Sequence, residues 1–251
     1  MKKPPQSSRP LERALPRAYD ASGQVAARVK AVRVRKTGSR TTSSQQWLER
    51  QLNDPFVAEA QRLGYRSRAA FKLLQLNEKF ALLRPDCVIV DLGAAPGGWS
   101  QVAAALMRPE RGGRVLALDI LEMEPLPGII PICGDFTDPA MVEQLRRELP
   151  NGADLVLSDM AEPTTGHART DHLRILRLAE LALDFAEQVL KPNGDFVVKL
   201  FQGGGEKAIL DRLKRNFTRV KHAKPAASRK DSAETYVVAQ GFRTNHGQAK
   251  D

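Results

Sequence analysis

Five apolar runs that alternate with helical patterns place the strongest constraint on how this 251-residue chain can fold. The runs are CVIVDLG (87–93), RVLALDI (114–120), IIPICGDF (129–136), ADLVLSDM (153–160) and GDFVVKLF (194–201). The helical patterns cover residues 54–64, 67–83, 97–107, 138–149 and 171–190. Strands that are apolar on both faces are typical of parallel sheets covered by helices. The chain is therefore predicted to have an α/β fold with a mostly parallel sheet and helices on both faces.

Local signals define where several of these helices begin and which side they bury. Asp54, followed by Pro55, is an expected N-cap, and Ser67 is the expected N-cap of the next helix. In the long helix 171–190, apolar residues recur at steps of three and four, which gives one broad face to pack on a sheet: Leu176, Ala179, Leu183, Ala186 and Leu190.

The end of the chain breaks the alternation. The runs RVKHAKP (219–225) and ETYVVAQGF (234–242) are separated only by the loop 226–233. Two strands without a crossover helix between them must be antiparallel neighbours. They bring the expected sheet to seven strands. A closing hairpin of this kind is more typical of methyltransferase sheets than of nicotinamide-binding ones.

The charge is concentrated at the N-terminus. Residues 1–40 contain 11 Lys and Arg against Glu12 and Asp20, and so supply +9 of the net charge of +10. We expect a disordered basic tail over 1–44, one compact domain over 45–242 and a polar tail over 243–251. Such a tail raises nucleic-acid affinity without reading sequence. It could instead be inert or a transit peptide, although four prolines interrupt any amphipathic helix there: Pro4, Pro5, Pro10 and Pro16.

Other compartments and metal sites are disfavoured. No apolar run is long enough to span a bilayer, and no secretory signal is visible, so we expect a cytoplasmic monomer. Cys87 and Cys133 are isolated, without a CxxC pair or suitably spaced histidines, so neither a zinc site nor any other metal site is expected.

The glycine-rich turn after the first strand indicates the type of ligand. A dinucleotide fingerprint needs a second glycine two positions after Gly93, but Ala95 stands there and its methyl group would obstruct a pyrophosphate. Asp91, at the end of the strand, is a carboxylate that favours a cation. S-adenosylmethionine (SAM) combines a cationic ammonium and sulfonium with the absence of phosphate, and it is the predicted cofactor.

Two further acids follow neighbouring strands. Asp119 is placed to accept hydrogen bonds from a ribose diol, and Asp135 to accept one from an adenine amino group. The alternative is that each acid merely caps the helix that follows it, although Asp138 is the better cap after the third strand.

Four motifs, DLGAAPGGWSQ, SDMAEPTTG, GDFVVKLFQG and KPAASRKDSAETYVVA, together resemble the FtsJ-type ribosomal RNA 2'-O-ribose methyltransferases, and the likeness covers about residues 45–242. The resemblance implies a Rossmann-like class I SAM-dependent fold. It implies a catalytic set of Lys72, Asp159, Lys199 and Glu234. It also implies SAM contacts by Gly97, Trp99, Asp119, Asp135 and Asp159. One departure affects substrate contacts: Glu162 and Pro163 follow SDMA, where the family commonly has Pro and Asn.

Lys199 stands out independently of this resemblance. It interrupts an otherwise apolar strand, where a lysine is costly unless its ammonium reaches a polar site or water. Asp159 lies at the end of the neighbouring strand. Lys199 is expected to contact the substrate hydroxyl, while Asp159 orients that hydroxyl. Which group accepts the hydroxyl proton stays open, because nearby cations and acids shift a lysine pKa in opposite directions.

The resemblance implies methylation of a uridine in the peptidyl-transferase region of 23S ribosomal RNA, within the large ribosomal subunit. The alternatives are a tRNA or mRNA-cap methyltransferase, or an inactive RNA-binding relative. Two basic clusters are expected to form rims for RNA, unless they are simply solvated: Arg62, Arg66, Arg68 and Lys72, and Lys214, Arg215, Arg219, Lys221, Lys224, Arg229 and Lys230. Tyr65 and Trp47 could stack on bases, whereas Phe71 is expected in the core.

Overall fold

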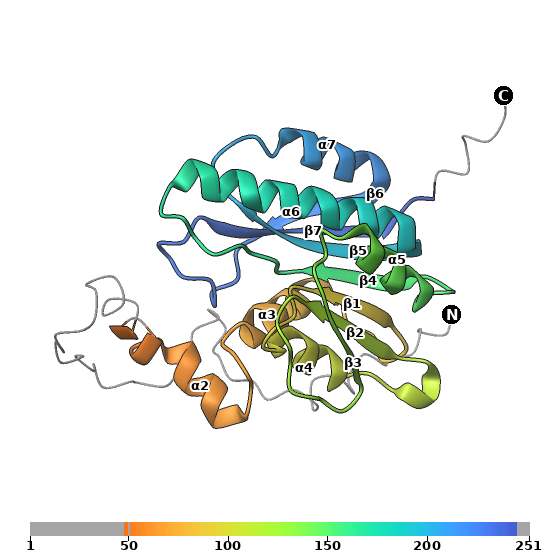
Figure 1. The fold of residues 1–251 in the computed structure, drawn as a ribbon, viewed down its shortest axis with the longest axis horizontal. Helices are drawn as coiled ribbons and strands as arrows, with labels where there is room; N and C mark the ends of the chain where they lie inside the picture. Colours follow the sequence, from red (N-terminus) through yellow and green to blue (C-terminus); the bar gives the residue numbers. More distant parts are fainter. Residues whose placement is uncertain (1–47, 50, 245–251) are drawn as a thin grey trace, which may run out of the picture.

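The computed structural model describes residues 48–49 and 51–244. The predicted tail 1–44, Trp47 and most of the tail 243–251 lie outside this part of the chain. One seven-stranded sheet runs through the centre of the molecule in the order β3-β2-β1-β4-β5-β7-β6 (Figure 1). The strands are β1 (Val88–Leu92), β2 (Arg114–Asp119), β3 (Ile129–Cys133), β4 (Ala153–Ser158), β5 (Leu190–Phe201), β6 (Phe217–Ala223) and β7 (Glu234–Phe242).

The pairing confirms the predicted topology. Strands β1 to β5 pair in parallel, whereas β7 is antiparallel to both β5 and β6. The chain builds β1 to β3 outward in one direction and then returns to place β4 on the other side of β1. Open α/β sheets bind ligands at such a reversal, beyond the carboxyl ends of the strands.

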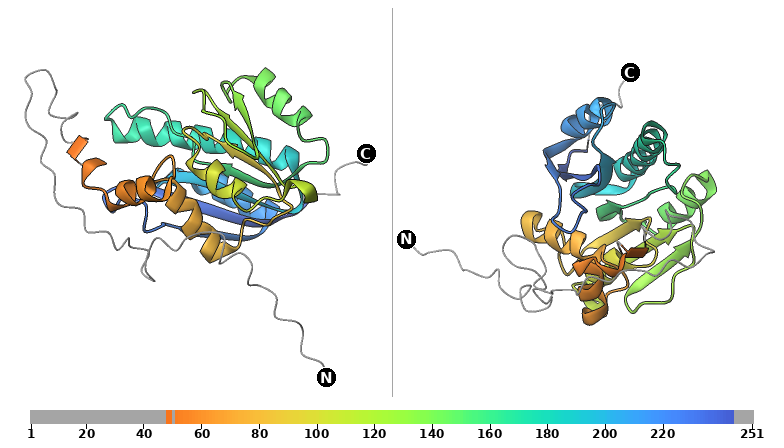
Figure 2. Two further views of the ribbon diagram at one scale, coloured as in Figure 1. Left: turned by 90° about the horizontal axis from the view of Figure 1, so that it is seen from below. Right: turned by 90° about the vertical axis from the view of Figure 1, so that its left-hand side faces the viewer.

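Helices cover both faces of the sheet, as the sequence predicts (Figure 2). The helices α2 (Pro55–Leu63), α3 (Ala70–Phe80) and α4 (Gly98–Ala104) pack on one face, and α5 (Pro139–Arg147), α6 (Ala168–Val189) and α7 (Lys207–Asn216) pack on the other. A short 3-10 turn spans Pro109–Arg111. Within the described residues, none of the helices is both long and apolar enough to cross a membrane.

The helix starts test the predicted caps. The side chains of Asp54 and Asp138 accept hydrogen bonds from the backbone amides of Phe56 and Ala140, so both N-caps are confirmed. The Ser67 cap is wrong: α3 begins at Ala70 without a side-chain cap. The reason is tertiary, because the Ser67 hydroxyl packs so closely on Gly98 that a Cβ there would lie 2.3 Å from it.

The long helix and the closing segment also differ in detail from the prediction. Helix α6 begins at Ala168 rather than Asp171, and its predicted apolar face is buried in the core. Helix α7 was not predicted. Its buried residues are Ile209 and Leu213, and Leu210 packs partly against the core, in a short segment that is otherwise rich in charged residues.

Alternation along the strands determines which side chains meet. Successive residues of a strand point to opposite faces of a sheet. In β4, Leu155 and Leu157 pack on the α3 and α4 side, so Asp159, two positions later, continues on that side. Lys199 of β5 shares this face with Val197 and lies opposite Tyr236 of β7 in the pairing register.

Candidate active site

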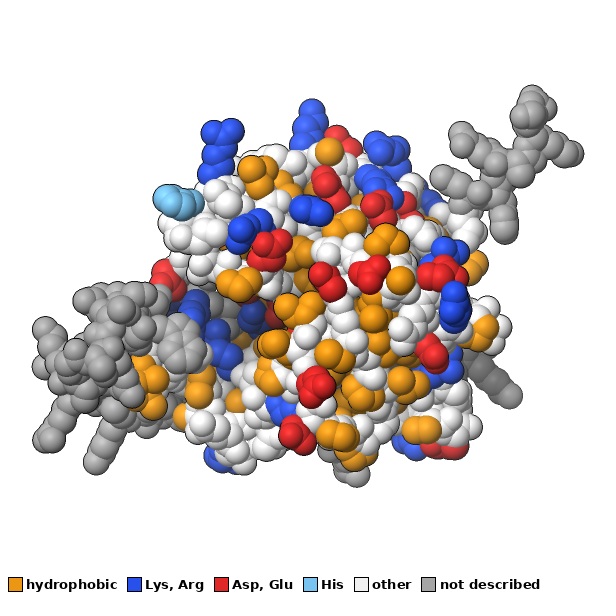
Figure 3. Space-filling model, viewed as in Figure 1, with side chains coloured by type: hydrophobic (Ala, Val, Ile, Leu, Met, Phe, Trp, Pro, Cys, Tyr) orange, Lys and Arg blue, Asp and Glu red, His pale blue; other side chains and the backbone are white. Residues whose placement is uncertain are grey.

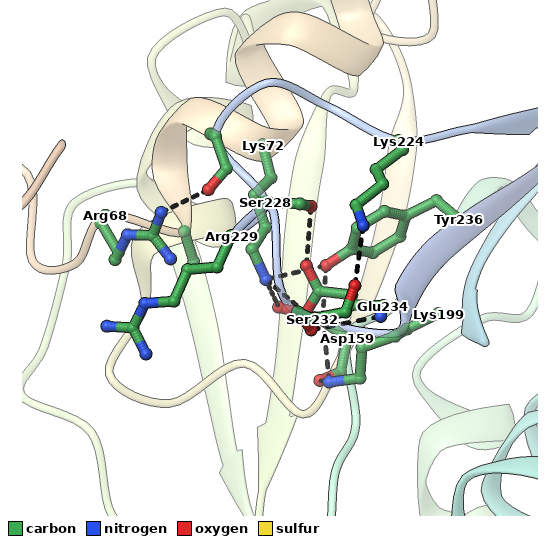
Figure 4. Close-up of polar contacts among 12 residues, drawn as sticks. Arg68, Lys72, Asp159, Lys199, Lys224, Ser228, Arg229, Ser232, Glu234 and Tyr236 are labelled. Carbon is green, nitrogen blue, oxygen red and sulfur yellow. Dashed lines mark hydrogen bonds and ion pairs between the residues drawn. The ribbon is translucent and has the colours of Figure 1, made fainter. Parts of the chain in front are cut away.

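The four residues predicted to be catalytic lie together at the carboxyl ends of the central strands (Figure 4). Lys199 Nζ lies 3.0 Å from Asp159 Oδ1 and donates to the Asp159 carbonyl at 2.5 Å. Lys72 Nζ lies 2.8 Å from Glu234 Oε2 and 3.7 Å from Asp159 Oδ2. Two lysines on different elements therefore share one carboxylate.

Tyr236 is a fifth member that the sequence analysis missed. Its hydroxyl donates to Asp159 Oδ1 at 2.8 Å and accepts from Lys72 Nζ at 3.0 Å. The ring is fully buried and packs against Trp99, with ring centroids 5.5 Å apart. A signal was present in the sequence, because Tyr236 lies two positions after Glu234 in a strand and must share its face.

Electrostatics keep this cluster in a defined charge state. Burial alone raises the pKa of a carboxyl group, but at Asp159 the ammonium groups of Lys199 and Lys72 outweigh it and hold the pKa below its usual range. Burial, together with the charges of Asp159 and Glu234, raises the pKa of Tyr236 well above its ordinary value. Asp159 is thus an anion and Tyr236 a neutral hydroxyl at physiological pH.

A cavity of about 750 Å³ opens at the carboxyl ends of β1, β2 and β4. Its volume falls in the range of small-molecule sites. Among the described residues, its acidic lining residues are Asp119, Asp135, Asp159 and Glu162, against one base, Arg177. Apolar side chains complete the wall: Leu118, Ile120, Leu121, Phe136, Met160 and Leu178. The lining suits a partly apolar ligand with positive charge and disfavours a pyrophosphate.

Four predicted cofactor residues line this cavity: Gly93, Asp119, Asp135 and Asp159. Asp119 Oδ2 accepts from the Ala95 amide at 2.9 Å, which ties the turn after β1 to the end of β2. Asp135 Oδ1 accepts from the Thr137 amide and hydroxyl, and these bonds hold the pKa of Asp135 below its usual range. Gly93 has a positive φ of 75°, and a Cβ there would lie 2.7 Å from the Met160 backbone, so glycine is required by close packing.

The three other predicted cofactor residues are not among the described residues that line this cavity. Gly97 is the left-handed N-cap of α4, with φ 105°. Trp99 is 3% exposed and its indole N–H donates to the Ala69 carbonyl. Asp91 is fully buried; one carboxylate oxygen accepts from Ser100 Oγ at 2.6 Å and the other has no hydrogen-bond partner among the described residues.

The buried Asp91 gives the fold a specific pH dependence. Burial raises the pKa of this carboxyl from 3.8 to about 7, helped by the charges of Asp159 and Asp119. The pKa of Asp91 is higher in the folded protein than in the unfolded chain. Its contribution to the free energy of unfolding is therefore fully present below about pH 4 and is lost as the pH rises toward 7. The full loss is at most about 4 kcal/mol. We expect Asp91→Asn, which keeps an acceptor for Ser100, to remove this loss.

Urea unfolding at pH 4, 6 and 8 tests this expectation. The free energy of unfolding of Asp91→Asn relative to the unmodified protein should increase steadily from pH 4 to pH 8. Parallel pH curves for the two proteins would show that Asp91 is ionised in the folded state and would contradict the account.

The first predicted basic cluster is engaged within the molecule. Arg66 donates to the carbonyls of Pro96, Glu124 and Pro125, and so joins the turn after β1 to the loop after β2. Arg62 pairs with Glu59, and Arg68 pairs with Asp54. All seven residues of the second cluster have exposed or partly exposed positions, although Lys224 and Arg229 also make contacts within the molecule. Phe71 is fully buried, as predicted, and Tyr65 packs edge-on against it.

Comparison with known proteins places this arrangement among methyltransferases. A family model described as FtsJ-like methyltransferase matches residues 65–242. A relative named Ribosomal RNA large subunit methyltransferase E, from Paramagnetospirillum magneticum, is 60% identical over 215 residues, which cover 84% of this chain and 88% of the relative. A relative of the same name from Xanthobacter autotrophicus is 58% identical over 220 residues, 87% of each chain.

Among solved structures, one described as a ribosomal RNA methyltransferase from Plasmodium falciparum superposes with a TM-score of 0.61 at 30% identity. It covers 71% of this chain and 98% of its own. The segment 65–242 that the family model matches contains Lys72, Asp159, Lys199 and Glu234.

Proposed function

Because this chain belongs to the FtsJ-like methyltransferase family, we propose that it transfers a methyl group from SAM to a ribose 2'-hydroxyl of large-subunit ribosomal RNA. One observation carries the proposal. Asp159 lines the ligand cavity and, on its other side, contacts Lys199, Lys72 and Tyr236. A ligand in the cavity would therefore lie next to the cluster of catalytic groups.

The cavity residues fit SAM. The four acids that line it can hold the cationic amino-acid end, and Asp119 retains lone pairs for a ribose diol beyond its two backbone contacts. Apolar side chains beside Asp135 offer a surface for an adenine ring. We place Asp91, Gly97 and Trp99 in the cofactor site as well, as residues that shape the turn after β1 or contact SAM through backbone groups.

Bound SAM would supply an electrophilic methyl group on its sulfonium. The protein must hold the ribose oxygen in line with that methyl group and help remove one proton. Two contacts from Asp159 fix the ammonium of Lys199, and one of its three N–H donors remains for the ribose oxygen. Asp159, held anionic, orients Lys199, while Glu234 and Tyr236 fix Lys72. Positioning of this kind can contribute about 7–11 kcal/mol.

The substrate assignment rests on the relatives, which are named for the large ribosomal subunit RNA. We propose a uridine of the peptidyl-transferase region of 23S RNA, presented in the assembled subunit, with a cytoplasmic enzyme acting as a monomer. Lys and Arg side chains gather beside α2, under the N-terminal end of α6, where the surface is hollowed (Figure 3). These charges suit an RNA backbone.

A substrate panel tests the proposal. The protein is incubated with labelled SAM and, in parallel, unmodified large ribosomal subunits, free ribosomal RNA and tRNA, and the nucleosides are then separated by mass spectrometry. We expect label in a 2'-O-methyluridine from the large subunit. Label mainly in tRNA would favour the tRNA alternative, and label on a base would refute ribose chemistry.

The basic tail is expected to add affinity without specificity. Deleting residues 1–40 removes 11 Lys and Arg. The slope of log K against log salt for RNA should become shallower by about 0.7–0.9 for each phosphate that the tail neutralises. Binding titrations across a range of salt concentrations measure this slope. An unchanged slope would show that the tail does not contact RNA.

A further inference from the structure

The loop that joins β6 to β7, residues 224–233, is fixed against the rest of the molecule. Gln75 Oε1 accepts from the Ala227 amide at 2.9 Å, and the Arg68 guanidinium donates to the Ala227 carbonyl. Lys224 Nζ closes the loop by donating to the Ser232 carbonyl at 2.7 Å. Ala227 and the next residue, Ser228, are both buried. The middle of the loop is thus held by Gln75 of α3 and by Arg68, which precedes that helix.

This loop contacts the catalytic cluster directly. Ser228 Oγ donates to Glu234 Oε1 at 2.8 Å, while Glu234 Oε2 accepts from Lys72 at 2.8 Å (Figure 4). The two oxygens of one carboxylate are therefore assigned to different partners. Ser228 of the loop thus supplies one of the two contacts that orient the Glu234 carboxylate beside Lys72.

Asp54 holds the loop from outside the catalytic cluster. Its Oδ2 lies 2.9 Å from Arg68 Nε and 3.6 Å from Arg229 Nε, and Arg229 directly follows Ser228. The carboxylate is 8% exposed. Burial lowers the pKa of the Arg68 guanidinium, and Asp54 is the main charge that opposes this shift.

Helix capping does not explain the charge of Asp54. Its Oδ1 caps α2, a role that a neutral Asn fills equally well. Asp138 provides the comparison, because it caps α5 in the same Asp-Pro setting, is exposed, and makes no ion pair with any described residue. Asp54 also precedes the segment 65–242 that the family model matches.

We propose that Asp54 is a positioning residue for methyl transfer. Its negative charge holds the guanidinium groups of Arg68 and Arg229 in place, and these hold the β6–β7 loop. Ser228 in that loop then orients the Glu234 carboxylate toward Lys72. The inference rests on the proposed function for its catalytic consequence, while its structural part stands separately.

Two isosteric variants test the charge of Asp54 with the cap preserved. Asp54→Asn should accelerate amide exchange in peptides covering 224–233 and lower kcat about tenfold, as expected for loss of one coupling of this kind. The KM for SAM should stay within about twofold. Asp138→Asn, the matched control, should change neither quantity. Equal exchange and equal kcat in both variants would overturn the proposal, as would an Asp54→Asn effect confined to the melting temperature.

The path through the loop is tested by Ser228→Ala. This variant should also lower kcat, and the double variant with Asp54→Asn should be no slower than about the slower single variant, because both act on Glu234. If the fold-reductions in kcat of the two single variants multiply in the double variant, Asp54 and Ser228 act independently, and the proposed path from Asp54 through the loop to Glu234 is overturned. If the unmodified protein transfers no methyl group, the proposed function fails, and the exchange rates still decide whether Asp54 fixes the loop.

Discussion

Replacing Lys199 with alanine is expected to lower kcat for ribose methylation by about 10²–10⁴-fold, which is the effect of removing a group that acts on the reacting oxygen. SAM affinity should stay within a few-fold, because Lys199 does not line the cavity and Asp159 keeps Lys72 and Tyr236 as partners. Single-turnover rates and calorimetric SAM titrations measure the two effects separately.

Lys191→Ala is the matched control for that substitution. Lys191 is the second residue of the same strand, β5, and pairs with Asp154 at 2.8 Å, at the opposite end of the strand from the cluster. Its replacement should leave kcat unchanged. Normal turnover by Lys199→Ala would remove Lys199 from the chemistry, and loss of SAM binding together with turnover would assign it to the cofactor site instead.

Replacing Asp159 with asparagine is expected to impair both binding and chemistry. The carboxylate lines the cavity and neutralises two lysines whose side chains are 7% and 10% exposed. An amide leaves the Lys199 ammonium without the carboxylate it pairs with, while Lys72 keeps Glu234, so the free energy of unfolding should fall by about 1–3 kcal/mol. The Kd for SAM should rise at least about tenfold and kcat should fall at least about 100-fold.

Asp184→Asn controls for loss of an acid as such. Asp184 is half exposed on α6 and pairs with Arg212, away from the cavity. Its replacement should leave SAM binding and turnover unchanged. Full SAM affinity in Asp159→Asn would separate the cavity from the catalytic cluster and contradict the role that we propose for Asp159.

The central strands and their mostly parallel arrangement could be predicted because their signal is local. Runs such as 87–93 and 153–160 are apolar on both faces, which only a sheet covered on both sides accommodates. The hairpin 219–242 was predictable because its loop is too short for a crossover. Helix α7 was missed because its three core-facing residues, Ile209, Leu210 and Leu213, lie in a short segment dominated by charged residues.

The catalytic set was predictable from motif likeness, whereas its surroundings depended on tertiary contacts. Tyr236 joins Asp159 and Lys72 only when β7 pairs with β5. Arg66 reads from the sequence as a free RNA-binding charge, yet its carbonyl partners lie 30 to 59 residues away in the chain. Partners so distant in the chain cannot be predicted from the neighbouring residues. A cluster of charged residues in the sequence therefore does not show whether the side chains bind RNA or make contacts within the protein.

A crystal structure with S-adenosylhomocysteine, the demethylated product, tests most directly whether the cavity and the lysine cluster form one active site. We expect its sulfur in the cavity beside Asp159, facing Lys199. A ribose oxygen should then fit about 3–3.5 Å from the position that the methyl carbon of SAM would occupy on that sulfur, while it contacts Lys199 Nζ. Product bound outside the cavity would contradict the assignment. So would a sulfur that points away from Lys199 and lies far from Asp159.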